Sequence, residues 1–121
     1  MPTQGEIITG NRIGFEKSNK ALGFIYKEWY ELISKLLTEI DGINIELGCG
    51  ASFIDQVNKS IKKTDVFLNS NTDFKLNAMD IGQKFESKIS NLILVNVFHH
   101  LNDPVLFLKA AEKSLLPGGR I

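Results

Sequence analysis

The stretch Ile43–Phe53, Ile-Asn-Ile-Glu-Leu-Gly-Cys-Gly-Ala-Ser-Phe, decides the fold. Its first five residues are apolar and β-prone at every second position, and two glycines follow with one residue between them. A segment compatible with a helix comes next and is opened by Ser52. The stretch therefore predicts a strand, a glycine turn and a helix. In such a unit, free backbone N–H groups and the start of the helix favour a bound nucleotide or amino acid.

Two acidic residues extend this interpretation. Glu46 stands two residues before the first glycine, and a carboxylate at the end of a buried strand is costly unless it serves a partner such as a cationic or hydroxyl-bearing ligand. Asp65 lies 19 residues beyond Glu46. In nucleotide-binding α/β units, an acidic residue about 20 positions after the glycine turn accepts hydrogen bonds from ribose hydroxyls. The alternative for Asp65 is a solvated turn residue, and the spacing alone leaves both interpretations open.

Length and composition restrict the class of protein. The 121 residues correspond to one domain with a real core. Fourteen basic and fourteen acidic residues are dispersed along the chain, which argues against a nucleic-acid partner. No run of 18 apolar residues and no leader pattern occurs, so we expect no membrane span and a soluble, cytoplasmic protein. The single cysteine, Cys49, agrees with a reducing compartment.

The rest of the chain alternates between helical and strand-like patterns. A helix is expected from about residue 17 to 40, with an aromatic cluster that serves either as core or as a lid over a ligand. Further strands are expected near residues 64–68, 74–79 and 92–95, and a helix is expected to begin at Pro104 and to stop at Pro117. This order predicts an α/β fold, a Rossmann-like doubly wound and mostly parallel sheet, with the ligand at the carboxyl ends of the strands.

Four motifs in this order carry a resemblance to a known family. They are Glu46–Gly50, Asp65, Asn77–Met79, and the block from Leu92 to Gly119 that contains Phe98–Pro104 and Leu116–Arg120. Together they resemble the class I S-adenosylmethionine-dependent methyltransferases, closest to the small-molecule type 11 branch. The resemblance covers about residues 42–121.

The resemblance implies methyl transfer from S-adenosyl-L-methionine to a small-molecule or lipid-like acceptor, with S-adenosyl-L-homocysteine as product. For the methionine half of the cofactor, it implies contacts with Glu46 near the ammonium group and with Asn96 and Val97 beside this half. Gly48, Cys49 and Gly50 would lie under the methionine and the ribose, and Asp65 would bind the ribose hydroxyls. Asn77, Ala78 and Met79 would contact the adenine. Asn77 replaces the commoner aspartate, although its amide oxygen can still accept from the adenine amino group. The third glycine of the dinucleotide-binding turn is missing, and Ser52 stands near its place.

Catalytic residues are harder to assign. His99 and His100 are adjacent, and neighbouring residues on an ordinary helix or strand point in different directions, so no metal site is expected from the pair. One histidine is expected to cap or pack, while the other could serve as a general base. A sulfonium methyl group already reacts well with a nucleophile held in line, so the family needs little acid-base chemistry.

The sequence also predicts how the chain is divided and where its sheet ends. Residues 1–41 are interpreted as a lead-in and helix, and residues 42–121 as an incomplete methyltransferase core, truncated after about four strands in the order three, two, one, four. The strand Leu92–Val95 would then be an unpaired edge through which a homodimer could form. Two other functions stay open, namely a non-catalytic cofactor-binding fragment or partner subunit, and an NAD-dependent oxidoreductase.

Overall fold

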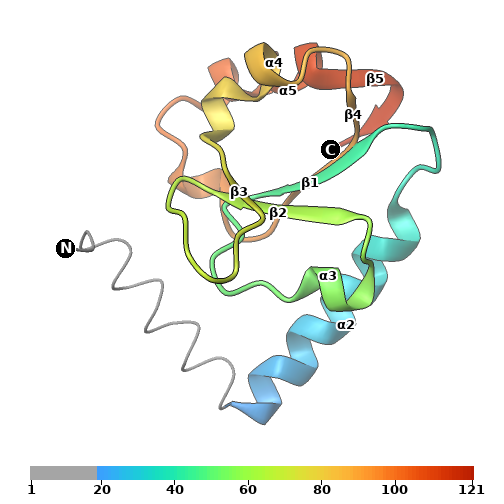
Figure 1. The fold of residues 1–121 in the computed structure, drawn as a ribbon, viewed down its shortest axis with the longest axis vertical. Helices are drawn as coiled ribbons and strands as arrows, with labels where there is room; N and C mark the ends of the chain where they lie inside the picture. Colours follow the sequence, from blue (N-terminus) through green and yellow to red (C-terminus); the bar gives the residue numbers. More distant parts are fainter. Residues whose placement is uncertain (1–18) are drawn as a thin grey trace.

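The computed structural model describes residues 19–121 (Figure 1). Two short 3-10 turns, η1 and η2, separate some of the regular elements. In chain order the elements are α2 Lys20–Leu36, β1 Ile43–Leu47, α3 Ile54–Val57, β2 Ile61–Asp65, β3 Phe74–Lys75, η1 Ala78–Asp80, α4 Ile81–Lys84, β4 Ile89–Leu94, η2 Phe98–His100, α5 Pro104–Ser114 and β5 Leu115–Arg120.

The strands form one sheet in the order β3-β2-β1-β4-β5. Every neighbouring pair is parallel, from β3 beside β2 to β5 beside β4. Helices α4 and α5 cover one face of the sheet, and α2 and α3 cover the other (Figure 1). The predicted Rossmann-like fold, the order of its first four strands and the N-terminal helix are confirmed. The crevice of such a sheet lies at the carboxyl ends of the strands, where β1 stands between the two directions of winding.

The expected number of four strands is wrong, because Leu115–Arg120 forms a fifth strand. Its first residue, Leu115, pairs with Ile89, and its last residue, Arg120, pairs with Asn91. Pro117 lacks a backbone N–H and is tolerated in this outermost strand, whose free side needs no donor. Strand β5 therefore covers the edge of β4 from Ile89 to Asn91. Leu92–Leu94, which belong to the segment expected to be an unpaired edge, do not pair with β5.

The core lies on both faces of the sheet. On β1, Ile45 and Leu47 point toward α4 and α5, while Glu46 points to the opposite face. The core under α4 and α5 consists of Ile45, Leu47, Leu76, Ile81, Ile89, Leu92, Phe107 and Ala111. The core under α2 and α3 consists of Tyr30, Ile54, Ile61 and Ile93.

Helix α2 ends at Leu36, earlier than its apolar pattern predicts. Asn91 of β4 accepts a hydrogen bond from Thr38 N at 2.8 Å and donates one to Thr38 O at 2.9 Å. Arg120 of β5 donates to Leu36 O at 2.8 Å. Backbone groups that another helical turn would use are thus satisfied by side chains from the sheet.

Local boundaries differ from the expected ones elsewhere too. Strand β2 runs from Ile61 to Asp65, so it begins and ends three residues earlier than the expected strand near residues 64–68, and α3 is a single turn. Strand β3 stops at Lys75 because Asn77 accepts from Met79 N at 3.0 Å and so caps the 3-10 turn η1.

Candidate functional site

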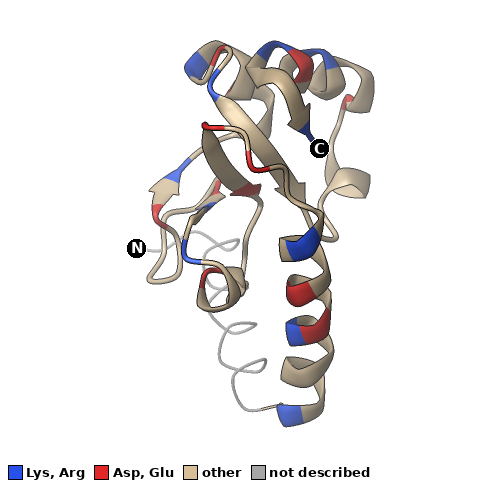
Figure 2. Cartoon of the chain, turned by 90° about the vertical axis from the view of Figure 1, so that its right-hand side faces the viewer, with Lys and Arg blue, Asp and Glu red and all other residues tan. Residues whose placement is uncertain are grey.

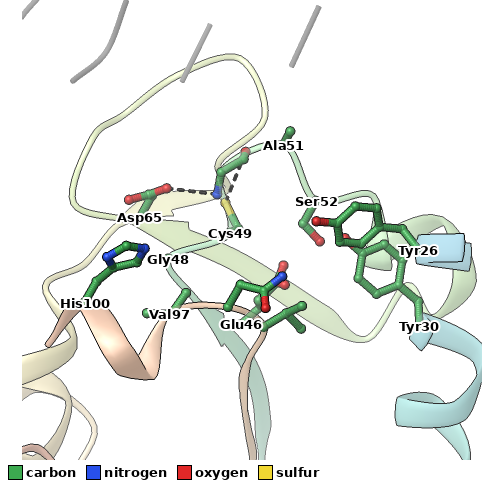
Figure 3. A pocket seen from close by; sticks show the side chains of 13 residues that line it. Tyr26, Tyr30, Glu46, Gly48, Cys49, Ala51, Ser52, Asp65, Val97 and His100 are labelled. Carbon is green, nitrogen blue, oxygen red and sulfur yellow. Dashed lines mark hydrogen bonds between the residues drawn. The ribbon is translucent and has the colours of Figure 1, made fainter. Parts of the chain in front are cut away.

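A cavity of about 190 Å³ lies at the carboxyl ends of β1, β2 and β4 (Figure 3). We call it the turn cavity, because the glycine turn after β1 forms its wall. Its lining residues are Tyr26, Tyr30, Glu46, Gly48, Cys49, Gly50, Ala51, Ser52, Asp65, Val95, Asn96, Val97 and His100.

The glycine turn has a conformation that only glycine adopts without strain at two positions. Gly48 has φ +60° and Gly50 has φ +50°, both in the left-handed region. Cys49 N donates to Thr64 O at 2.8 Å, and Gly50 N donates to the Asp65 carboxylate at 2.9 Å (Figure 3). The end of β2 therefore holds the turn beside the cavity.

Replacing Gly48 with alanine is expected to destabilise the protein more than the same change at Gly50. A Cβ atom on Gly48 would lie 2.7 Å from Val97 Cγ2, whereas one on Gly50 would meet nothing within 4 Å. Both variants carry the strain of a positive φ, but the overlap adds about 1 to 3 kcal/mol at Gly48 only. Urea unfolding of the two variants measures the difference, and equal losses of stability would show that Val97 moves aside freely.

Glu46 is a buried acid beside this turn. It is 2% exposed, and among the described residues its Oε1 has no hydrogen-bond partner. Burial raises the pKa of Glu46 to about 8, against the lowering effects of a hydrogen bond with Ser52 and of the charge on Lys63. The site thus contains a carboxyl group whose charged form lacks a full set of partners, which is costly inside a protein.

Lys63 does not supply the missing partner, although it lies beside Glu46 across the β1–β2 pair. Its Nζ binds Asn71 Oδ1 at 2.7 Å, Asp55 at 3.0 Å and Ser52 O at 3.4 Å. Asn71 in turn donates to Gly50 O at 2.9 Å and to Ser52 O at 2.7 Å. The loop after β2 therefore braces the glycine turn by binding the carbonyl groups of Gly50 and Ser52.

Replacing Asn71 with aspartate is expected to damage this brace more than the change in size suggests. The variant keeps an acceptor for Lys63 but turns a second oxygen toward two carbonyl oxygens and removes two donated bonds. We expect a loss of about 2 to 4 kcal/mol in unfolding free energy, from two lost bonds and an unfavourable contact between acceptors. Urea unfolding measures it, with Asn71→Ala as the comparison. A variant as stable as the parent would show that the loop does not hold the turn.

A second cavity of about 490 Å³ adjoins the first, and we call it the loop cavity. Gly48, Asp65, Val97 and His100 line both cavities. The remaining residues of the loop cavity are Val66, Phe67, Leu76, Asn77, Ala78, Met79, Leu101, Asn102 and Asp103.

The structure brings all ten predicted cofactor-binding residues to these two cavities. Seven line the turn cavity, and Asn77, Ala78 and Met79 line the loop cavity. Asn77 Oδ1 already accepts from Met79 N, so this N–H is not free to bind a ligand. The predicted residues therefore lie along one continuous wall that runs from Glu46 past Asp65 to Met79.

The histidines and the cysteine have separate positions. Both histidines are exposed, their ring centroids are 3.9 Å apart, and only His100 lines the cavities. Between residues 19 and 121, no group of three or more His, Cys, Asp or Glu residues could hold a metal ion. Burial, followed by the nearby charge of Glu46, raises the pKa of Cys49 to about 12, which makes the thiol a packing group and a poor nucleophile.

The aromatic cluster expected as core or lid consists of Tyr26, Trp29 and Tyr30. Tyr26 and Tyr30 of α2 line the turn cavity, whereas Trp29 is 45% exposed and lines neither cavity. Sequence reasoning missed Lys63. Lys63 was not predicted to lie in a buried strand, because β2 begins at Ile61, earlier than expected. A lysine within a strand otherwise marked by Ile61 and Thr64 is the signal that could have indicated a buried ion pair.

Comparison of the sequence with protein-family models and with curated proteins gives no match. No helix in the described part of the chain has the length and apolar character needed to cross a membrane.

Proposed function

We propose that the protein is an S-adenosylmethionine-dependent methyltransferase of a small-molecule or lipid-like acceptor. One observation carries the proposal: two acidic residues lie along the same wall. Glu46 is a buried carboxyl group whose Oε1 has no hydrogen-bond partner among the described residues, and the Asp65 carboxylate is shared by two adjoining cavities. A ligand with a cationic group at one end, a diol in its middle and a planar base at the other would fit these groups in that order.

The Asp65 carboxylate fits the middle of such a ligand. Its Oδ2 accepts from Gly50 N at 2.9 Å, and its Oδ1 accepts from Val66 N at 2.7 Å. Each carboxylate oxygen has a further lone pair, so two ribose hydroxyls can still donate to it. The backbone bonds hold the carboxylate in place before the ligand arrives, which reduces the entropy lost on binding.

Glu46 fits the cationic end. An ammonium group would supply the missing hydrogen bond to Oε1 and would favour the charged form of the carboxyl group. Tyr26 and Tyr30 lie across the turn cavity from Gly48 (Figure 3), where they would shield the cationic end of the ligand from water.

The cofactor, when bound, supplies a methyl group on a positively charged sulfur, which is an electrophile without further activation. The protein then has to hold the acceptor in line and to keep water out, which accounts for a site with few acid-base groups. His100 is the described histidine that faces the cavities, and it is the candidate to accept a proton from the acceptor.

Titration calorimetry with S-adenosylhomocysteine and, separately, with NAD tests the cofactor. We expect binding of the first and none of the second, because Phe53 stands where a dinucleotide-binding turn that begins at Gly48 has its third glycine. Binding of NAD alone would overturn the proposal in favour of an oxidoreductase.

Transfer of a labelled methyl group to a panel of small-molecule and lipid-like acceptors tests the reaction. Transfer that requires the protein supports the enzyme. Tight binding of S-adenosylhomocysteine without transfer to any acceptor would instead favour a non-catalytic cofactor-binding module.

A further inference from the structure

Helix α2 has more apolar surface than the other described residues cover. Its inner face packs on the sheet through Tyr26, Tyr30 and Ile33, and Leu37 directly after the helix joins the same core. A second set of apolar residues, which we call the outer stripe, lies next to this face on the helix. The outer stripe consists of Leu22, Ile25, Trp29, Leu32 and Leu36.

The spacing of the outer stripe is that of a helix-pairing seam. Its members follow one another at intervals of three, four, three and four residues, which is the alternation of a and d positions in a heptad repeat. Leu32 is 58% exposed and Leu36 is 59% exposed, and Ile25 and Trp29 are also exposed. Single exposed apolar residues are ordinary, but a continuous stripe of this kind marks an interaction surface.

Charges beside the stripe specify the orientation of a partner helix. Glu28 and Lys35 occupy equivalent g positions of two successive heptads, on the side of the stripe away from the inner face. If Trp29 of one copy packs against Leu32 of a second, antiparallel copy, then Glu28 of each lies opposite Lys35 of the other. Figure 2 shows acidic and basic residues interspersed along this helix. A parallel pair would not bring the two g positions together, so the charge pattern favours the antiparallel one.

The position of α2 in the fold also permits this arrangement. The first half of the helix projects beyond the sheet and its covering helices, while the second half lies against them (Figures 1 and 2). An antiparallel pair puts the two sheets at opposite ends of the paired helices. The projecting first half of each α2 then packs against the second half of the other copy's α2. At the end of that second half, Leu36 borders an apolar groove together with Leu92 and Ile121.

We propose that two copies of the chain associate through the outer stripes of α2, packed antiparallel about a two-fold axis. This interface differs from the sheet edge considered in the sequence analysis, since it uses helix side chains and no backbone groups of β4. A closed two-fold pairing of identical surfaces limits the assembly to a dimer.

Sedimentation velocity at tens of micromolar protein tests the proposal. We expect a dimer for the parent and a monomer for Leu32→Glu, with a dissociation constant raised about 100-fold or more because each interface loses two buried leucines. Phe24→Glu is the matched control, because Phe24 is an exposed apolar residue of the same helix that lies outside the stripe. It should remain a dimer.

Charge exchange tests the orientation. Glu28→Lys and Lys35→Glu should each weaken the dimer about three- to tenfold, and the double variant should restore it. Circular dichroism of each variant verifies that α2 is intact. A monomeric parent, or a dimer that survives Leu32→Glu in a folded protein, would overturn the proposal. A double variant as weak as the singles would overturn the antiparallel pairing.

Discussion

Replacement of Asp65 with alanine is expected to weaken binding of S-adenosylhomocysteine about 100-fold or more, because two charge-assisted hydrogen bonds of about 1.5 to 3 kcal/mol each are lost. The same change removes the acceptor for Gly50 N and so loosens the glycine turn under the ligand. Titration calorimetry at constant pH and salt measures the affinity.

Two further variants separate these contributions. Asp65→Asn keeps an oxygen for Gly50 N but loses the charge, so its affinity should lie between those of the parent and the alanine variant. Asp73→Ala is the matched control, since Asp73 accepts from Lys63 N at 2.8 Å but lines neither cavity. It should lower stability and leave the affinity nearly unchanged. If Asp65→Ala binds as tightly as the parent, the assignment of the ribose is wrong.

The sequence predicted the parts of the structure that depend on local signals. The strand Ile43–Leu47 is found with its predicted bounds, because alternating β-prone residues and the Gly48 turn determine both its extent and its end. Helix α5 begins at Pro104 as expected, since Asp103 accepts from Leu106 N at 3.0 Å and so caps the helix. These features need only neighbouring residues.

The sequence did not predict features that depend on distant contacts. Strand β5 contains a proline and two glycines, a composition that disfavours a strand until a neighbouring strand supplies its partners. The end of α2 depends on Asn91 and Arg120, both far away in the sequence. The hydrogen bonds of Lys63 and Asn71 connect β2 and the loop after it with the glycine turn after β1. The sequence alone shows these residues only as ordinary polar positions.

The stability of the unliganded protein should fall as the pH rises from about 4.5 to about 8 because of Glu46. In the folded state burial raises the pKa of this carboxyl group from 4.5 to about 8, so the folded protein holds a proton that the unfolded chain has released. The contribution is fully present below pH 4.5 and is lost by pH 8, at a slope of at most about 1.4 kcal/mol per pH unit. Glu46→Gln cannot titrate, and urea unfolding across this range should show a smaller slope for it than for the parent.

Ligand affinity should follow the opposite trend if the cationic end of the cofactor lies against Glu46. Binding favours the carboxylate, so each complex formed near pH 7 releases a proton, and affinity rises toward pH 8 by up to about tenfold per unit. Near pH 6 the parent holds a neutral carboxyl group, and Glu46→Gln should bind S-adenosylhomocysteine about as well. Near pH 8 the parent should bind up to about 100-fold more tightly than the variant.

Calorimetry in buffers with different ionisation enthalpies counts directly the protons released on binding. Subtracting the number released by Glu46→Gln from the number released by the parent removes the contribution of the ligand and of all other groups. Because Asp65 and Asp55 also face Glu46 and raise its pKa, the comparison of the two proteins is needed to assign the proton to this residue. Parallel affinity profiles for the two proteins from pH 6 to 8, together with equal proton release, would contradict the placement of the cationic group. The cofactor would then bind with its ribose on Asp65 but with its amino-acid end directed away from Glu46.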